Sequence, residues 1–124
     1  RIMLISGQEV RQEFIENLSS FGINYFHFPV YTIHIKENVE FSTHFKNSKS
    51  NYIILTSPSS VEAIMKNLPL IDLSKMKTRI ISIGPTTSAS IKENRGKIFL
   101  ESEVQNINIL YESLDSLIAD SSID

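Results

Sequence analysis

Two short apolar runs, each followed by a corner rich in serine, threonine and proline, constrain the fold of this chain most strongly. The first run, Tyr52–Thr56, precedes helical spacing over Ser59–Asn67, and the second, Arg79–Ile83, precedes helical spacing over Thr86–Glu93. Apolar runs of this length that are rich in isoleucine are typical of buried parallel strands. The sequence therefore predicts two consecutive strand–helix units of a parallel α/β sheet.

The rest of the chain continues this pattern. Ile2–Ile5 predicts a first strand, and Gly22 predicts the end of the helix that follows it. Tyr25–Ile35 predicts an edge strand that runs into a connector, because the proline within it has no N–H to give to a ladder. Lys97–Leu100 predicts a last strand, followed by a helix around Ile107–Ala119.

These repeats predict a flavodoxin-like α/β fold with three layers, in which helices cover both faces of a parallel sheet of about five strands. The expected strand order is 2-1-3-4-5, because right-handed crossovers then place strands 1 and 3 at the switch point of the sheet. The 124 residues correspond to one domain, 1–124. Residues 36–50 are polar, and we expect a connector there with at most a short amphipathic helix.

Composition and charge exclude several functional classes. The net charge of −2 gives no basic surface for nucleic acid or for an anionic membrane. The absence of cysteine removes disulfides, thiolate catalysis and cysteine zinc sites. No apolar run approaches the ~20 residues of a membrane span, so we expect no membrane partner and a cytoplasmic location.

No metal or organic cofactor is expected either. His27 and His34 are seven residues apart, which places them on opposite faces of an extended segment, and no carboxylate accompanies them or His44 at ligand spacing. The chain also lacks the glycine-rich loops that hold nucleotides and the Ser, His and Asp order of hydrolases.

The hydroxyl side chains at the two corners are the candidate binding residues. Ser57, Ser59 and Ser60 begin one helix, and Thr86 and Thr87 begin the other. N–H groups in the first turn of a helix lack intrahelical partners and attract anions. Two such corners on neighbouring parallel strands open at the carboxyl edge of the sheet, where open α/β sheets bind ligands. A single corner more often only caps its helix, and the residues alone leave this alternative open.

Four short motifs follow one another along the chain. They are Ser6-Gly7 with Arg11, Pro29-Val-Tyr31-Thr32, Thr56-Ser-Pro-Ser-Ser-Val61 and Ile83-Gly-Pro-Thr-Thr-Ser-Ala89. No single motif is specific, but their order and spacing resemble uroporphyrinogen-III synthase, the family that closes the linear tetrapyrrole in haem biosynthesis. The resemblance extends roughly from Met3 to Leu117 and adds Ser6, Arg11 and Gly84 to the candidate substrate-binding residues.

The resemblance implies a lyase that needs no cofactor. Its substrate is hydroxymethylbilane, a flexible tetrapyrrole rich in carboxylates. Loss of water leaves a cationic azafulvene, ring D is attacked at its substituted carbon to give a spiro intermediate, and the ring then reopens and closes inverted. Tyr31 matches the tyrosine that the family places facing its cleft, which implies a general acid for the departing hydroxyl. A tyrosine that merely covers the core from an edge strand is an equally open alternative.

Members of this family are longer than the present chain and carry two such halves, and the motif forms here resemble the second half. In the family, each half begins in one lobe and finishes in the other, with the substrate held between them. The resemblance therefore implies a C-terminal half or a truncated relative, with a lobe crossover near residues 35–50. A missing N-terminal half or a second copy would be its partner. The alternative from another class is a non-catalytic flavodoxin-like module that binds an anion or a protein.

Overall fold

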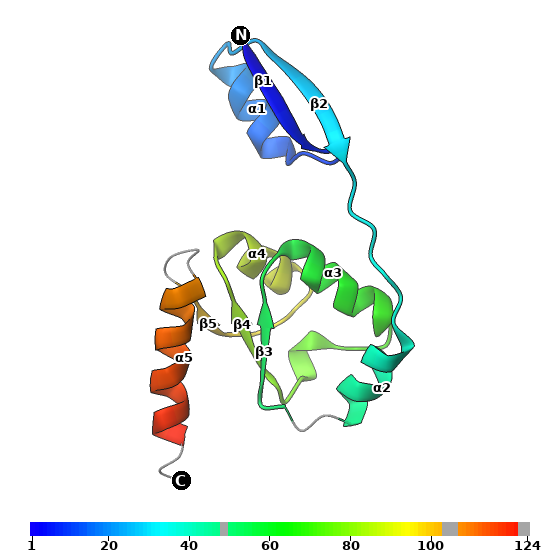
Figure 1. Ribbon diagram of the computed structural model, residues 1–124, viewed down its shortest axis with the longest axis vertical. Helices are drawn as coiled ribbons and strands as arrows, with labels where there is room; N and C mark the ends of the chain where they lie inside the picture. Colours follow the sequence, from blue (N-terminus) through cyan, green and yellow to red (C-terminus); the bar gives the residue numbers. More distant parts are fainter. Residues whose placement is uncertain (48–49, 103–106, 122–124) are drawn as a thin grey trace. The chain divides into compact units, whose positions relative to one another are not determined.

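The computed structural model describes residues 1–47, 50–102 and 107–121 (Figure 1). The chain divides into two compact units, unit 1 with residues 1–34 and unit 2 with residues 35–124. The division lies next to the stretch for which the resemblance implies a crossover, and residues 48–49 of that stretch lie outside the described ranges. None of the helices in the described ranges is long and apolar enough to cross a membrane.

Unit 1 is a strand–helix–strand motif made of β1 (Ile2–Gly7), α1 (Gln12–Ser20) and β2 (Tyr25–Tyr31). The two strands pair in parallel, and the register shifts after the pair of Ser6 with Pro29. Gly22 ends the helix as expected: its φ is +64°, a conformation in which glycine has no Cβ penalty, and the next N–H donates to the Leu18 carbonyl oxygen at 2.9 Å.

One face of the β1–β2 sheet is open to solvent. Met3 pairs with Phe26 and Ile5 pairs with Phe28 across the two strands, and these four side chains are 48–64% exposed. We call them the open apolar face. Leu4 alternates with them on β1 and is half-buried on the opposite face. Within residues 1–34, all of which are described, no apolar side chain is fully buried.

Unit 2 contains a three-stranded parallel sheet in the order β3-β4-β5. Its elements are α2 (Val39–Asn47), β3 (Tyr52–Leu55), α3 (Pro58–Asn67), the short 3₁₀ helix η1 (Leu73–Lys75), β4 (Arg79–Ser82), α4 (Pro85–Glu93), β5 (Ile98–Glu101) and α5 (Ile107–Ser121). The short amphipathic helix that was allowed within residues 36–50 is present as α2, and the helices α3 and α4 pack against each other.

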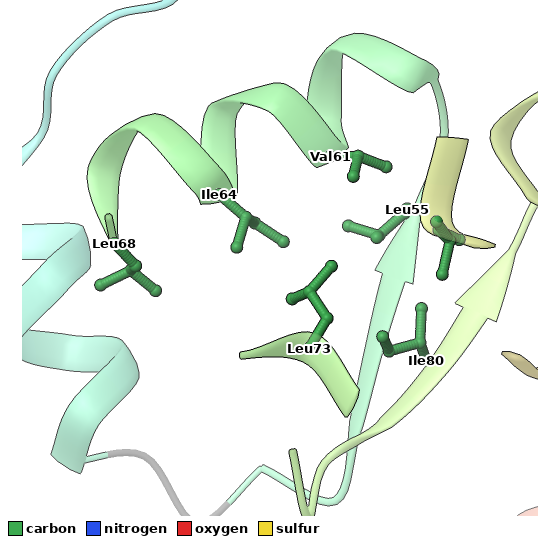
Figure 2. Close-up of a cluster of buried hydrophobic side chains, with 7 residues drawn as sticks. Leu55, Val61, Ile64, Leu68, Leu73 and Ile80 are labelled. Carbon is green, nitrogen blue, oxygen red and sulfur yellow. The ribbon is translucent and has the colours of Figure 1, made fainter. Parts of the chain in front are cut away.

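The core of unit 2 lies between α3 and the sheet (Figure 2). Val61 and Ile64, about one helical turn apart on α3, belong to one buried cluster with Leu55 of β3 and Ile80 of β4. Each of these four side chains is at most 5% exposed, and burying an aliphatic side chain of this size contributes about 1.5–3 kcal/mol. The remaining members are Leu68, Leu73 and Ile91.

The parallel α/β class is confirmed, but the single five-stranded sheet in the order 2-1-3-4-5 is wrong. The strands form one sheet of two, β1-β2, and one of three, β3-β4-β5. Within unit 2, Asn67 at the end of α3 binds the segment that leads into α2. The Asn67 side chain donates to the Lys36 carbonyl oxygen at 3.0 Å and accepts from the Asn38 N–H at 2.7 Å. The Ser42 hydroxyl donates to the Asn67 carbonyl oxygen at 2.9 Å.

Candidate functional site

The two hydroxyl-rich corners lie side by side at the carboxyl edge of the unit 2 sheet. Leu55 at the end of β3 pairs with Ser82 at the end of β4, and the Ile83 N–H donates to the Leu55 carbonyl oxygen at 3.1 Å. The turns into α3 and α4 therefore start from neighbouring positions. The structure brings together the serines of the first corner and the threonines of the second on one edge of unit 2.

At the α3 corner the hydroxyls largely satisfy one another. Ser57 is the N-cap residue, and its side chain accepts from the Ser60 N–H at 3.2 Å. Its Oγ also lies 2.9 Å from the Oγ atoms of both Ser59 and Ser60. Three hydroxyl protons serve these two hydroxyl–hydroxyl bonds, which leaves one for a ligand. This corner is thus both a helix cap and a limited donor site.

The α4 corner is built differently, because its N-cap residue is Gly84, which has no side chain to cap the helix. The buried Ser82 hydroxyl instead closes the turn, accepting from the Gly84 N–H at 3.3 Å and donating to the Gly84 carbonyl oxygen at 2.9 Å. That oxygen also accepts from the Ser88 N–H at 3.0 Å. Both of its lone pairs are therefore in use.

The first turn of α4 consequently keeps unused donors. Pro85 has no N–H, and the N–H groups and hydroxyls of Thr86 and Thr87 make no hydrogen bond with any part of the chain that the structure describes. Thr86 is half-buried, whereas Thr87 is 2% exposed. A helix N-terminus carries a partial positive charge, so these donors suit an anion. The α4 corner is the stronger candidate anion site of the two.

The carboxyl edge of the unit 1 sheet holds the other predicted site residues. The Tyr31 ring is 59% exposed and lies over Gly7, where an added Cβ would come within 2.9 Å of the ring atom Cε2. The Tyr31 carbonyl oxygen accepts from the Gln8 N–H at 2.8 Å, which fixes the backbone beneath the ring. Tyr31 is therefore an exposed side chain above a backbone that this hydrogen bond fixes.

Ser6 and Arg11 occupy different environments in unit 1. The Ser6 hydroxyl donates to the Gly7 carbonyl oxygen at 2.9 Å and lies 2.8 Å from His27 Nε2, so its own proton is already in use. Arg11 is the exposed N-cap residue of α1, and its guanidinium forms no ion pair with a described residue. Arg11 therefore remains available for a carboxylate, whereas Ser6 offers lone pairs more readily than a proton.

Three residues of these sites escaped the sequence reasoning. Gly7 belongs to the first motif, but nothing in the sequence indicates that it supports the Tyr31 ring. Ser82 interrupts an otherwise apolar strand, and that interruption is the signal that indicates a polar role. Ser88 lies within the fourth motif but was not a candidate; it is 2% exposed, and its hydroxyl has no hydrogen-bond partner in the described part of the chain. Over the described ranges, no group of three His, Cys, Asp or Glu residues is placed to hold a metal ion.

In unit 2, two neighbouring parallel strands are each followed by a helix whose first turn carries hydroxyl side chains. This arrangement is typical of α/β proteins that bind anionic groups through backbone N–H groups and hydroxyls. Within that class, the family model described as uroporphyrinogen-III synthase HemD matches residues 1–112. The chain belongs to this family, as its four motifs indicated.

A solved structure supports the fold. The crystal structure of uroporphyrinogen-III synthetase from Helicobacter pylori 26695 matches with a TM-score of 0.70 at 20% sequence identity. The match covers 93% of this chain and 52% of that one, so the present chain spans about half the length of the matched protein. No curated protein gives a significant match to the sequence.

Proposed function

We propose that this chain forms part of a uroporphyrinogen-III synthase, a lyase that cyclises hydroxymethylbilane with inversion of ring D and releases water. The observation that carries the proposal is the family match over residues 1–112, joined to the unused donors in the first turn of α4. The proposed chemistry uses only protein side chains and backbone, and we infer a cytoplasmic location for it.

The proposed substrate is bound through its carboxylates at the two corners of unit 2. The net charge of the chain is −2, so a general excess of basic residues does not supply the attraction. Each helix N-terminus favours an anion by about 0.3–1 kcal/mol, and each hydrogen bond to a charged group adds about 1.5–3 kcal/mol. Thr86 and Thr87 form the main contact in this proposal, with Gly84 as the N-cap residue that leaves their donors unused, and the three serines of the α3 corner form a second. On unit 1, Ser6 and Arg11 are further proposed substrate-binding residues.

In the proposed mechanism Tyr31 acts as the general acid. Its phenol donates a proton to the substrate's hydroxymethyl oxygen as the carbon–oxygen bond breaks, so that water leaves and the azafulvene cation forms. The phenolate recovers a proton when the ring closes and the pyrrole loses one. The bilane closes without help to the wrong isomer, so the protein must mainly orient ring D. The exposure of Tyr31 and its support by Gly7 favour this role.

We further propose that the chain is the C-terminal half of such an enzyme, with the lobe crossover at residues 35–50, and that it works with a complementary half or with a second copy. The open apolar face of unit 1 supports this, because parallel sheets are normally covered on both faces. A sheet of two strands is also marginal on its own. About half of the H. pylori protein has no counterpart in this chain. We propose that a segment equivalent to that half covers the open apolar face.

The test is the isomer produced from hydroxymethylbilane. The chain is incubated with the substrate over a concentration series, the products are oxidised to porphyrins, and types I and III are resolved, while light scattering reports the assembly state. We expect type III product that increases as dimers form. Type I product alone at every concentration would exclude synthase activity in assemblies of this chain with itself, and would leave a required complementary half or a non-catalytic anion-binding module as the alternatives. Type III product from a strictly monomeric sample would remove the need for a two-lobed cleft.

A further inference from the structure

A groove of about 620 Å³ lies in unit 2, between the C-terminal ends of α2 and α3 and the segment that leads into β4. This volume falls within the usual range for small-molecule sites, about 300–1,000 Å³. Its apolar wall is formed by Phe45, Leu68, Leu70, Ile71 and Met76. Leu70 is 98% exposed, so the wall includes a large apolar side chain that nothing in the described chain covers.

The groove is distinct from the candidate anion site. Thr78, which lines the groove, directly precedes β4, whereas Gly84 follows the other end of the same strand. The four residues of β4 separate the two sites by roughly 13 Å at about 3.3 Å per residue. A ligand in the groove therefore does not occupy the first turn of α4.

The charged groups around the groove leave positive charge unneutralised. Asp72 is the acidic residue of the lining, and its carboxylate accepts from the Ser74 N–H at 3.0 Å and the Ser74 hydroxyl at 2.6 Å. It also pairs with Lys75 at 3.3 Å. Lys46 and Lys77 also line the groove, and neither forms an ion pair within the described ranges. In a chain of net charge −2, this is a local excess of positive charge beside an apolar wall.

We propose that the groove binds an amphipathic monocarboxylate, with its aliphatic chain along the wall at Leu70, Ile71 and Met76 and its carboxylate held by Lys46 and Lys77. The positive charge around the groove disfavours an aliphatic cation. A small inorganic anion has no apolar part that could cover the wall. A neutral hydrocarbon gains no attraction from the two exposed ammonium groups. The amphipathic anion satisfies the wall and the lysines together.

The two lysines are not equivalent in this argument. Lys46 lies in the last turn of α2, where a cation also offsets the partial negative charge of the helix end. Lys77 lies outside the helices, between η1 and β4, so it has no such role. A substitution at Lys77 therefore tests ligand binding without also changing the stability of a helix end.

The test is calorimetric titration of the whole chain with decanoate, with decyltrimethylammonium as the ligand of opposite charge. Lys77→Gln is compared with Lys97→Gln, an exposed lysine outside the groove lining. An ion pair at an exposed site corresponds to a change of about two- to fivefold in affinity. We expect decanoate binding to weaken by that factor in Lys77→Gln, to stay unchanged in Lys97→Gln, and to weaken as salt is added.

A second pair of variants tests the apolar wall. Leu70→Asn should weaken decanoate binding, whereas Val39→Asn, at an 82% exposed apolar residue outside the lining, should not. Both side chains are so exposed that neither change endangers the fold. Equal effects of the two lysine variants, equal binding of the cationic ligand, or no effect of Leu70→Asn would each overturn the proposal. The last result would place decanoate elsewhere, for example on the open apolar face of unit 1.

Discussion

Replacing Thr86 by valine separates a binding role from a capping role at the α4 corner. The two side chains have nearly the same shape and similar helix propensity, so the backbone of the first turn keeps its conformation. The Thr86 hydroxyl makes no hydrogen bond with the described residues, and the side chain is half-buried. Removing it therefore breaks no bond within the described chain, and we expect the free energy of unfolding to change by less than about 0.5 kcal/mol.

The expected effect on ligand binding is larger. A hydrogen bond to a charged group contributes about 1.5–3 kcal/mol, so losing one from Thr86 to a substrate carboxylate should weaken binding about tenfold or more. The N–H groups of the turn remain in the variant, and binding should not disappear. Binding is measured by fluorescence titration with uroporphyrin III, a stable tetrapyrrole rich in carboxylates, and stability by urea unfolding of the same samples.

Ser57→Ala is the matched control, because that hydroxyl is already used to cap α3. Its removal should lower the free energy of unfolding by about 0.5–2 kcal/mol, the usual effect of losing an N-cap side chain. The reasoning is refuted if Thr86→Val lowers stability as much as Ser57→Ala does while uroporphyrin affinity stays unchanged. Thr86 would then be a structural residue of the turn.

Four further changes test other contacts. Tyr31→Phe should slow formation of the type III isomer with near-normal affinity, because the proposed proton donation occurs in the transition state; an unchanged rate would remove that role. Gly7→Ala should slow the reaction similarly at little cost in stability, because the new methyl group, 2.9 Å from Cε2, displaces an exposed ring; unchanged kinetics would show that the ring position is unimportant. Ser88→Ala should raise the free energy of unfolding by about 1 kcal/mol, since it removes a buried hydroxyl without a described partner and improves helix propensity; lower stability in urea would contradict this. Hydrogen bonds from Ser74 hold the pKa of Asp72 below its ordinary value, so its carboxylate stabilises the fold at neutral pH and this contribution is lost as pH falls through the folded-state pKa. Asp72→Asn should accordingly be less stable than the parent chain at neutral pH, with the difference vanishing in acid; a difference independent of pH would contradict the assignment.

Periodicity and turn chemistry were enough to place the helices and strands of unit 2. The helix expected over Ser59–Asn67 begins one residue earlier, at Pro58, because proline is favoured in the first turn of a helix. The strand expected over Arg79–Ile83 ends at Ser82, where the hydroxyl turns back to the Gly84 backbone. These signals depend only on residues that are close together in the chain, so they can be recognised from the sequence alone.

The division into two sheets could not be read in the same way. Strand order is set by long-range pairing, and no local pattern in β1 or β3 indicates whether these two strands pair. The contacts of Asn67 within unit 2 are also long-range, because its side chain and carbonyl oxygen bind a segment about thirty residues earlier in the chain. An asparagine at the end of a helix predicts only a helix end, and nothing in its neighbours names Lys36 or Asn38 as partners. The expected strand order followed from the general rule for parallel sheets, whereas the described strands form two separate sheets.

The two hydroxyl-rich corners look alike in sequence, yet the structure gives them different chemistry. The difference arises at the N-cap, where Ser57 supplies a side chain that satisfies its own helix and Gly84 supplies none. In the second corner the capping contact moves back to Ser82 on the strand, and the donors of Thr86 and Thr87 stay unused by the residues that the structure describes. The pattern of serine and threonine after a strand therefore predicts where an anion site can form. The residue at the N-cap decides whether the donors of that corner are free to bind an anion. On that basis, α4 carries the main proposed contact to the substrate.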